Sequence, residues 1–235
     1  MSHLSLIAWN CRSGSMTSRI ADVTALAPDI VFLQEILPTE SLPLMGQFVS
    51  RRVGPQKGIA LGSLNANYQL VELEARAGAG LGSIAAAVSG PTSFNVLGIW
   101  SQAPSYVDYV MRAIAAYADV LRSGPSVVMG DLNSGSDLTR AQPSSKGHSR
   151  IVSALAELGL VSAYHAFHHI KHGHESHATY RHQFKATQPW HIDFCFVPRN
   201  WVDRLTGVEV VDGEDWRTRS DHHPLRVDLA VEPRV

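Results

Sequence analysis

Short apolar runs that each end in a polar segment most constrain how this chain can fold. Residues 4–8, 30–33 and 126–129 are such runs, rich in valine, isoleucine and leucine. Their length and composition are typical of strands buried on both faces of a sheet. We expect the polar segments that follow these and similar runs to converge on one edge. The segments are Trp9-Asn10, Gln34-Glu35, Gly130-Asp131-Leu132-Asn133, Ile192-Asp193 and Ser220-Asp221-His222.

The side chains of these segments indicate a type of chemistry. They supply carboxylates, two asparagines and an Asp–His pair, and no Ser–His or Cys–His nucleophile arrangement is evident. Hard divalent cations prefer oxygen ligands, and a cation with an activated water is suited to attack on a phosphoester. The sequence therefore predicts metal-assisted hydrolysis of a phosphoester.

In this order, the segments resemble the endonuclease/exonuclease/phosphatase superfamily, which includes exonuclease III-like AP endonucleases, DNase I-like nucleases, neutral sphingomyelinases and inositol polyphosphate 5-phosphatases. Three further segments extend the resemblance over nearly the whole chain. Residues 57–61 are similar to the glycine-containing strand after the family's metal glutamate, and residues 159–164 to its "GLVDAF" segment. Residues 190–194 are similar to the "WRIDY" segment of the exonuclease III branch. Each motif is weak alone, but the ordered set is specific.

The hydrophobic pattern predicts an α/β chain with a single domain over residues 1–235. Apolar residues at three- and four-residue steps predict helices over 106–121 and 150–158, and a shorter helix over 18–26. Strand-like stretches separated by Gly, Asn and Pro turns indicate antiparallel pairs at 58–63, 68–74, 83–88 and 94–99. We expect a four-layer αββα sandwich of two mixed, mainly antiparallel sheets flanked by helices. The resemblance implies the same architecture, with the active site in a cleft at one end of the sheets.

Three residues are candidates for holding the cation. Glu35 ends an apolar strand, and alone it would be a solvated strand terminus, but beside the other segments it is interpreted as a metal ligand. Mg²⁺ takes few carboxylates and keeps several waters, so Glu35 with help from Asn10 and Asp221 is sufficient. We therefore expect Mg²⁺ or Mn²⁺ as the cofactor.

Four residues are candidates for catalysis. Asp131 and Asn133 are two residues apart, so on extended backbone both can face the scissile phosphate, with Asp131 activating the water. The alternative is a turn whose side chains satisfy local amides. A carboxylate at Asp193 can orient the His222 imidazole and support its charge, or the two can form a purely structural bridge. The resemblance implies that His222 contacts the phosphate while Asp193 holds it.

Two residues depart from the family pattern. Trp100 occupies the approximate place of a tyrosine or histidine that reaches toward phosphate. Its indole can stack or donate one hydrogen bond but cannot exchange protons usefully, so we assign Trp100 to substrate binding. Arg12 stands where relatives keep a small acid or amide. Because an arginine cannot ligate a cation, it can pair with an acid or with substrate phosphate, which argues against a second metal there.

The chain contains an unusual tract of histidines between residues 165 and 182. Their spacing admits a zinc site, but no cysteine lies among them and Gly173 interrupts the helical pairs. The simpler expectation is a polar loop over the cleft, in which Tyr180, Arg181 and Trp190 select the substrate by stacking and charge. The histidines are His165, His168, His169, His172, His174, His177 and His182.

Charge and composition limit the cellular context. A net charge of −1 and a pI of about 6.9 give no global argument for nucleic acid. No apolar run of about 18 residues is present, and the first residues already show a strand pattern, so we expect a cytoplasmic location. Cys11 and Cys195 lie in or beside apolar strands, which predicts two buried reduced thiols.

Basic residues and histidines gather in segments expected to form loops near the site. That distribution suits an anionic substrate, although loops are polar and solvated in any case. The residues concerned are Arg140, Lys146, His148, Arg150, Lys171, Arg181 and Lys185.

The sequence predicts a Mg²⁺- or Mn²⁺-dependent phosphodiesterase, a nuclease that hydrolyses DNA or RNA by in-line attack of water. The alternative is an enzyme on a small or lipid phosphoester, such as an inositol phosphate or sphingomyelin, which the near-neutral charge permits. Residues 190–194 and the lack of an apolar membrane-docking stretch favour nucleic acid. A catalytically inactive binding module fits poorly, because every acid and amide that the chemistry needs is present. We expect a monomer with no stable membrane insertion.

Overall fold

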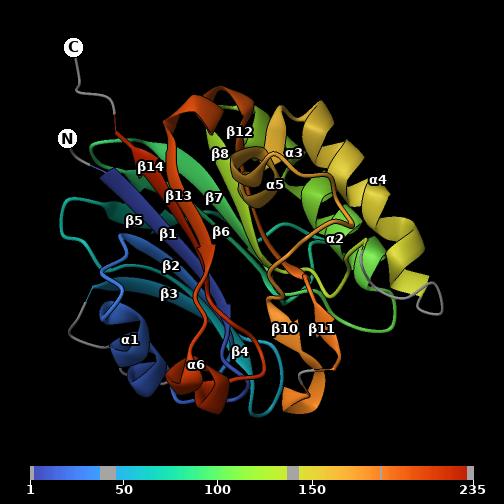
Figure 1. Ribbon diagram of the computed structural model, residues 1–235. Coiled ribbons are helices and arrows are strands. Elements are labelled where there is room, and N and C mark those ends of the chain that lie inside the picture. Colours follow the sequence, from blue (N-terminus) through green and yellow to red (C-terminus); the bar gives the residue numbers. More distant parts are fainter. Residues whose placement is uncertain (1–2, 38–45, 137–142, 186, 232–235) are drawn as a thin grey trace.

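The computed structural model describes residues 3–37, 46–136, 143–185 and 187–231, with the backbone alone for 143–146. Two six-stranded sheets pack face to face (Figure 1). The strands of the first sheet are β1 (His3–Asn10), β2 (Ile30–Ile36), β3 (Gln47–Arg52), β4 (Gly58–Ser63), β13 (Leu205–Val210) and β14 (Leu225–Ala230). Those of the second are β5 (Gln69–Glu72), β6 (Ser83–Ser89), β7 (Phe94–Ile99), β8 (Ser126–Asp131), β9 (Leu160–Ser162) and β12 (Asp193–Pro198).

Both sheets are mixed. The strand orders are β13-β14-β1-β2-β4-β3 and β5-β6-β7-β8-β12-β9. One pair in each sheet is parallel, β1 with β2 and β7 with β8, and the other paired strands run antiparallel. A small hairpin of β10 (Tyr180–Arg181) and β11 (Pro189–Trp190) lies at the lower end of the sheets in Figure 1.

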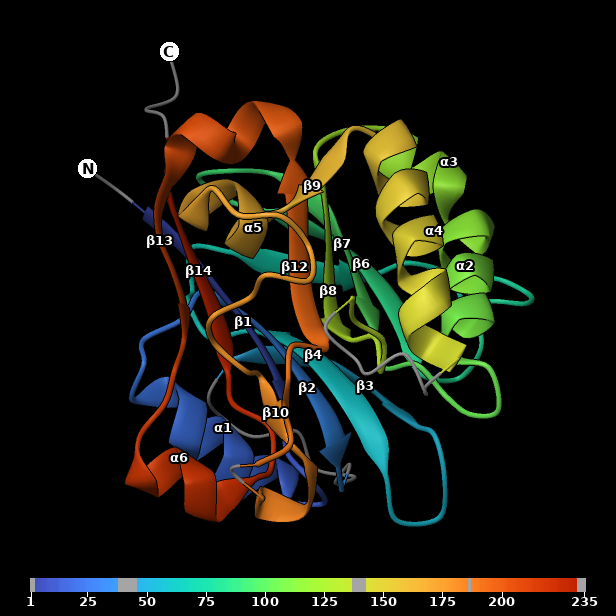
Figure 2. The same ribbon diagram turned by 45° about the vertical axis from the view of Figure 1, so that its right-hand side comes forward.

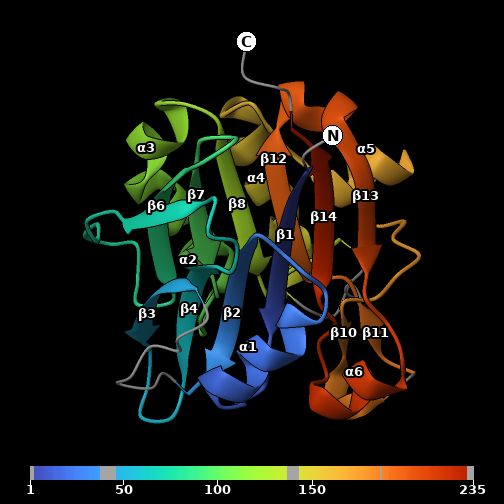
Figure 3. The ribbon, with the colours of Figure 1, turned by 90° about the vertical axis from the view of Figure 1, so that its left-hand side faces the viewer.

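Helices cover the outer faces of both sheets. Figure 3 shows α1 (Met16–Thr24) and α6 (Glu214–Arg219) at the lower end of the first sheet. The second sheet is covered by α2 (Tyr106–Ala116), α3 (Ala118–Arg122) and α4 (Pro143–Glu157), and α5 (Ala163–His168) packs beside β12 and β13. Two 3₁₀ segments, η1 (His182–Phe184) and η2 (Arg199–Arg204), complete the described elements. The expected αββα sandwich is confirmed.

The helix boundaries differ from the expected ones for local reasons. The helix expected over 106–121 breaks at Tyr117, whose φ of −107° and ψ of 15° are not helical. α4 begins seven residues before the expected start at 150. Residues 143–149 are polar and have no apolar period, so the sequence gives no sign of this earlier start. The first residue of α4 is Pro143, whose fixed φ suits the first position of a helix. α1 starts at Met16, after Ser15 caps the Ser18 amide.

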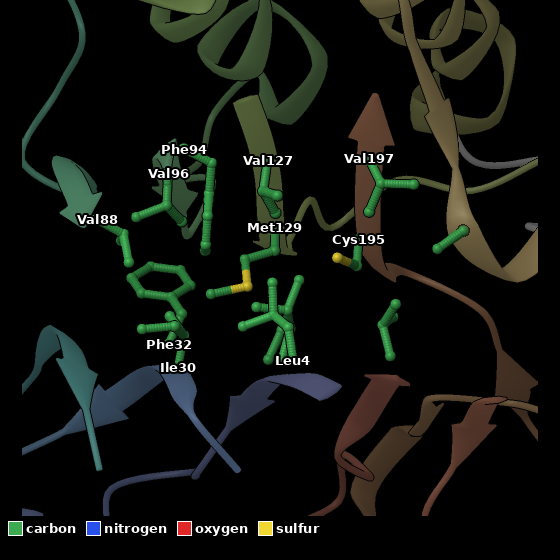
Figure 4. Packing of buried hydrophobic residues seen from close by; sticks show 14 of the residues in the cluster. Leu4, Ile30, Phe32, Val88, Phe94, Val96, Val127, Met129, Cys195 and Val197 are labelled. Atoms are coloured by element: carbon green, nitrogen blue, oxygen red, sulfur yellow. The ribbon is translucent and has the colours of Figure 1, made fainter. Parts of the chain in front are cut away.

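Alternation along the strands divides the core into three clusters, one for each interface of the sandwich. In β1, Leu4 and Leu6 point between the sheets, whereas Ile7 and Trp9 point toward α1. Figure 4 shows the layer between the sheets, where Phe32 and Met129 meet. β1, β2 and β8 are therefore buried on both faces, as the composition of residues 4–8, 30–33 and 126–129 predicts.

Cys11 and Cys195 are both buried and form no disulfide with each other, in agreement with the expectation of reduced thiols. None of the helices within the described ranges has the length and apolar character needed to cross a membrane.

Glycine is required at Gly130, directly before the polar end of β8. Gly130 has a φ of +136°, a conformation that L side chains rarely adopt. A Cβ there would lie 2.2 Å from the Ile99 carbonyl oxygen and 2.7 Å from the Phe32 ring. The backbone of β8 can therefore approach both neighbours only without a side chain at this position.

We predict that Gly130→Ala lowers the free energy of unfolding by about 2–4 kcal/mol, because it combines backbone strain with a clash. Gly124→Ala is the matched control, since a Cβ at Gly124 meets nothing within 4 Å. Urea unfolding followed by circular dichroism measures both variants. Equal stability of Gly130→Ala and the wild type would contradict the packing described for β8.

Candidate active site

The ends of four strands bring the predicted site residues together at one edge. β1 ends at Asn10 and β8 at Asp131, Glu35 lies near the end of β2, and β12 begins at Asp193. Because β8 and β12 are antiparallel, Asp131 and Asp193 are directly opposite each other in the ladder. The segment before β14 places His222 beside them, and Figure 2 shows β10 next to this edge.

The Asp131 carboxylate is buried and accepts three hydrogen bonds. Its Oδ2 accepts from Asn10 Nδ2 at 2.9 Å and from Asn133 Nδ2 at 3.1 Å, and its Oδ1 accepts from the Asn133 amide at 2.8 Å. The expectation of extended backbone from Asp131 to Asn133 is wrong. Asn133 has a φ of +46°, so the chain turns and Asn133 folds back onto Asp131. Asn133 therefore orients the carboxylate.

His222 links the two aspartates. Its Nδ1 lies 2.9 Å from Asp193 Oδ2, and its Nε2 lies 4.0 Å from Asp131 Oδ2. The Tyr180 ring packs over the imidazole at 4.4 Å between centroids. Asp193 is held in turn by its backbone amide, which donates to Thr179 Oγ1 at 3.0 Å. The imidazole is thus fixed with Nε2 directed toward Asp131.

Burial and neighbouring charges set the protonation states of Asp131 and His222. Burial, and then the neighbouring Asp193, raise the pKa of Asp131 well above its ordinary range. Burial alone would lower the pKa of His222, but the facing carboxylates of Asp193 and Asp131 raise it to about 9. At neutral pH the imidazole is therefore a cation, and Asp131 is a stronger base than an exposed aspartate.

Glu35 lies at a bulge in β2, where the pairing with β4 shifts between Gln34 and Ile36. Its φ of +53° turns the side chain out of the ladder. Asn10 Nδ2 donates to Glu35 Oε1 at 3.2 Å, and the Lys57 ammonium pairs with Oε2. Strained backbone at this position is typical of a functional site.

Asn10 and Asp221, two of the residues predicted to hold a cation, make different contacts. Asn10 presents its amide NH₂ to Glu35 and Asp131, while its oxygen accepts from the Arg12 backbone at 3.1 Å. Asp221 is buried and pairs with Arg12, whose Nε lies 3.6 Å from Oδ2. Arg12 thus pairs with an acid.

The charges that act on the Tyr180 phenol come from three carboxylates of the site. Burial, and then the charges of Asp221, Asp131 and Glu35, together raise the pKa of the Tyr180 phenol to about 12. Glu35 and Asp131 are also joined through Asn10, whose Nδ2 donates to both carboxylates. We call Glu35, Asp131 and Asp221 the acidic group, which is rich in oxygen and negatively charged. Such a set fits a hard divalent cation.

Two cavities flank the acidic group. One, of about 330 Å³, is lined by Arg181, Phe184, Arg217, Ser220, Asp221 and His223. The other, of about 400 Å³, is lined by Val53, Gly54, Pro55, Gln56, Lys57, Trp100 and Gln102. Both cavities border the acidic residues. Asp221 lines the first cavity, and Lys57, which pairs with Glu35, lines the second.

Two of the predicted substrate-binding residues, Arg181 and Trp100, line these cavities, whereas Tyr180 and Trp190 contact each other. Arg181 lines the first, held by Asp212 at 3.3 Å. Trp100 lines the second, 5.9 Å from the Lys57 ammonium. The Trp190 ring lies tilted against that of Tyr180, with 5.8 Å between centroids, and so supports the ring that covers His222.

The other basic residues expected near the site behave differently. His148 is fully buried on α4, and Arg150 pairs with Asp108 at 3.1 Å. His148 lies on α4 where a loop was expected, so that expectation is wrong. Arg150 lies on the same helix, in agreement with the helix expected over 150–158, and therefore not in a loop. Lys171 and Lys185 are exposed, and Arg140 and the Lys146 side chain lie outside the described residues.

The histidine tract divides between two places. His182 accompanies the site, with its Nδ1 2.7 Å from the Tyr180 hydroxyl. His165, by contrast, is buried on α5, and its ring is stacked on that of His172. A solvated loop over the cleft therefore describes only part of the tract.

Sequence reasoning missed three contributors. Lys57 was noted only as part of a strand motif, although its cationic side chain just before Gly58 was a usable signal. Thr179, which fixes Asp193, and Phe184, whose ring lies 4.3 Å from the Arg12 guanidinium, gave no sequence signal.

We predict that, in chelator-treated protein, the His222 imidazole titrates near pH 9, as followed by its NMR shifts. Asp193→Asn should lower this pKa relative to the wild type, because it removes one of the carboxylate charges that face the buried imidazole while Asp131 remains. With the pKa raised in the folded state, the stability from this pair is full below about pH 6.5 and is lost as the pH rises through about 9. A wild-type midpoint near 6.5 would contradict the charge arrangement.

Comparison with known proteins agrees with this geometry. The model of the Endonuclease/Exonuclease/phosphatase family matches residues 7–222, so the chain belongs to this family of phosphoester hydrolases. No curated protein matches the sequence.

Three solved structures share the fold. An AP endonuclease from Archaeoglobus fulgidus is 19% identical, with a TM-score of 0.71 over 95% of this chain and 98% of that one. A 3′ phosphatase from Neisseria, bound to a product DNA hairpin, is 19% identical, with a TM-score of 0.69 over 97% and 99%. The catalytic domain of APE2 from Xenopus laevis is 12% identical, with a TM-score of 0.75 over 98% and 93%.

Proposed function

We propose that this chain is a divalent-metal-dependent phosphodiesterase that hydrolyses nucleic acid. The observation that carries the proposal is the buried group of Asp131, Asp193 and His222, whose ligand atoms lie within 4.8 Å of one another. This group combines a base of raised pKa with a cationic imidazole, and Glu35 and Asp221 lie beside it. A base, a cation and oxygen ligands at one place are what water-mediated phosphoester hydrolysis needs.

Each residue has a separate task in this mechanism. Asp131, oriented by Asn10 and Asn133, takes a proton from the attacking water. The His222 imidazolium, held by Asp193, stabilises the negative charge that develops on the phosphoryl oxygens. A divalent cation held by Glu35 and Asp221, with Mg²⁺ or Mn²⁺ as the candidates, would supply Lewis-acid stabilisation of the phosphate and the leaving oxygen.

The two cavities support a polynucleotide rather than a small substrate. They border the acidic residues through Asp221 and Lys57, and they carry cationic and aromatic side chains, Arg181 and Phe184 in one and Lys57 with Trp100 in the other. Cationic and aromatic walls bind a chain of phosphates and bases. The Neisseria structure of the same fold contains product DNA, which also supports this substrate class.

We predict that Asp131→Asn lowers turnover by about 10²–10⁴-fold, because the amide cannot accept the proton from water. The measurement is Mg²⁺- or Mn²⁺-dependent cleavage of end-labelled single-stranded, duplex and abasic DNA, of RNA, and of small and lipid phosphoesters. A chelator should abolish the cleavage.

Asp119→Asn is the matched control, since Asp119 is an exposed acid on α3 that pairs with Arg76 at 2.9 Å. It should keep wild-type turnover. Near-wild-type turnover of Asp131→Asn would remove Asp131 from the chemistry. Hydrolysis confined to small or lipid phosphoesters would keep the mechanism and refute the nucleic-acid substrate.

We predict that Arg181→Gln raises KM for a polynucleotide more than it lowers kcat, because Arg181 lines a cavity next to the acidic group. Loss of one phosphate contact should reduce the slope of log affinity against log salt by about 1. Arg122→Gln, at an exposed arginine of α3, should change neither quantity. An unchanged salt slope in Arg181→Gln would exclude Arg181 from phosphate binding.

A further inference from the structure

A second group of potential metal ligands lies away from the acidic site, between α4, α5 and the outer side of β12. We call His148, His165, His172 and Glu175 the histidine cluster. Ligand atoms of His165, His172 and Glu175 lie within 4.8 Å of one another. His165 Nε2 is 2.7 Å from Glu175 Oε1, and the rings of His165 and His172 are stacked at 3.6 Å between centroids. Three potential ligands from two separate segments therefore lie close together.

Two ring nitrogens in the histidine cluster have no hydrogen-bond partner among the described residues. They are Nδ1 of His172 and Nε2 of His148, and both are inaccessible to solvent. His148 is 0% exposed, its Nδ1 lies 3.0 Å from Ser134 Oγ, and its ring is 5.6 Å from that of His172. Burying an unpartnered polar atom costs about 1–3 kcal/mol, so two in one place require an explanation.

The protonation of the histidine cluster suits metal binding. Burial lowers the pKa of His172 to about 4 and that of His148 to about 3, so both rings are neutral and carry a free lone pair at pH 7. Burial alone would raise the pKa of Glu175. The hydrogen bonds from His165 and from the Gly173 amide instead lower it to about 2, so Glu175 is ionised.

The surroundings of these ligands are those of a supported metal site. His165 uses its second nitrogen, Nδ1, to contact Ser162 Oγ at 2.7 Å, which fixes the ring with Nε2 toward Glu175. The Gly173 amide donates to both Glu175 oxygens at 2.9 Å and fixes that carboxylate. Outer contacts that orient each ligand are characteristic of protein metal sites.

We propose that the histidine cluster is a binding site for a transition-metal cation of the Zn²⁺ class. His165, His172 and Glu175 are its ligands, and the buried His148 is the candidate for the fourth position. Imidazole nitrogens with one carboxylate select Zn²⁺ and similar cations, whereas the oxygen-rich group at Glu35 suits Mg²⁺ or Mn²⁺. The chain would then hold two cations of different chemistry.

The position of the histidine cluster gives the cation a structural role. The chain that follows α5 carries His172 and Glu175 and then runs to β10 (Figure 2). On the way it passes Thr179, whose Oγ1 accepts from the amides of Ile192 and Asp193. A cation at the cluster would anchor this segment and so fix the strand that presents Asp193 to His222.

The test uses full-length protein without an affinity tag, because a histidine tag would itself bind the metal. Bound metal is measured by mass spectrometry after dialysis against Zn²⁺ with excess Mg²⁺, and Co²⁺ is titrated as a spectroscopic probe. We expect about one equivalent of Zn²⁺ per chain, a rise in Tm with Zn²⁺, and Co²⁺ absorption typical of four-coordinate geometry.

Three variants locate the metal. His172→Gln should lose the bound Zn²⁺ and the Co²⁺ absorption, whereas His174→Gln, at an exposed histidine of the same tract, should keep both. Glu35→Gln should also keep both, which excludes the acidic site as the source of the signal. Because these readouts do not depend on turnover, they are independent of the proposed phosphodiesterase activity.

Two results would overturn the proposal. One is wild-type protein that binds no Zn²⁺ and shows no rise in Tm with it, a result that does not depend on whether any variant folds. The other is His172→Gln that retains Zn²⁺ like the wild type. Loss of Zn²⁺ in Glu35→Gln, with retention in His172→Gln, would assign the metal to the acidic site.

Discussion

Two buried carboxylates, Asp131 and Asp193, lie opposite each other on adjacent antiparallel strands, and the site depends on how their repulsion is relieved. Neither aspartate can move away, because each is part of a strand buried on both faces. The His222 imidazolium, 2.9 Å from Asp193 and 4.0 Å from Asp131, supplies the compensating charge. The side-chain amides of Asn10 and Asn133 donate further hydrogen bonds to the Asp131 carboxylate. Raised basicity at Asp131 and a persistent cation at His222 are consequences of the same geometry.

The sandwich makes that geometry rigid. The strands that carry Asn10, Asp131 and Asp193 each contribute side chains to two core clusters, so a shift of register would expose one apolar face. Phe32 reaches into the space left by glycine in the facing sheet and brings β2 close to β8. Glu35, three residues farther along β2, is then carried to the same edge. The packing that holds the two sheets together therefore also brings the site residues to one edge.

The sequence was sufficient where a residue's position follows from strand period. Asn10, Glu35 and Asp131 stand at the ends of apolar runs, and their convergence could be predicted from that alone. It was insufficient where tertiary contacts decide the conformation. The left-handed turn at Asn133, the pairing of Lys57 with Glu35 and the early start of α4 leave no periodic signal. Likewise, His148 meets His172 through a tertiary contact, where α4 packs against Phe194 of β12.

In the proposed mechanism, water activated by Asp131 attacks phosphorus in a single step, and the stereochemical course of hydrolysis tests this step. The substrate would be an oligonucleotide with one phosphorothioate linkage of known configuration, hydrolysed in ¹⁸O-labelled water with Mn²⁺. A single in-line displacement predicts inversion at phosphorus. Retention would show two displacements through a covalent intermediate on the protein, and would contradict the assignment of Asp131 as the base for water.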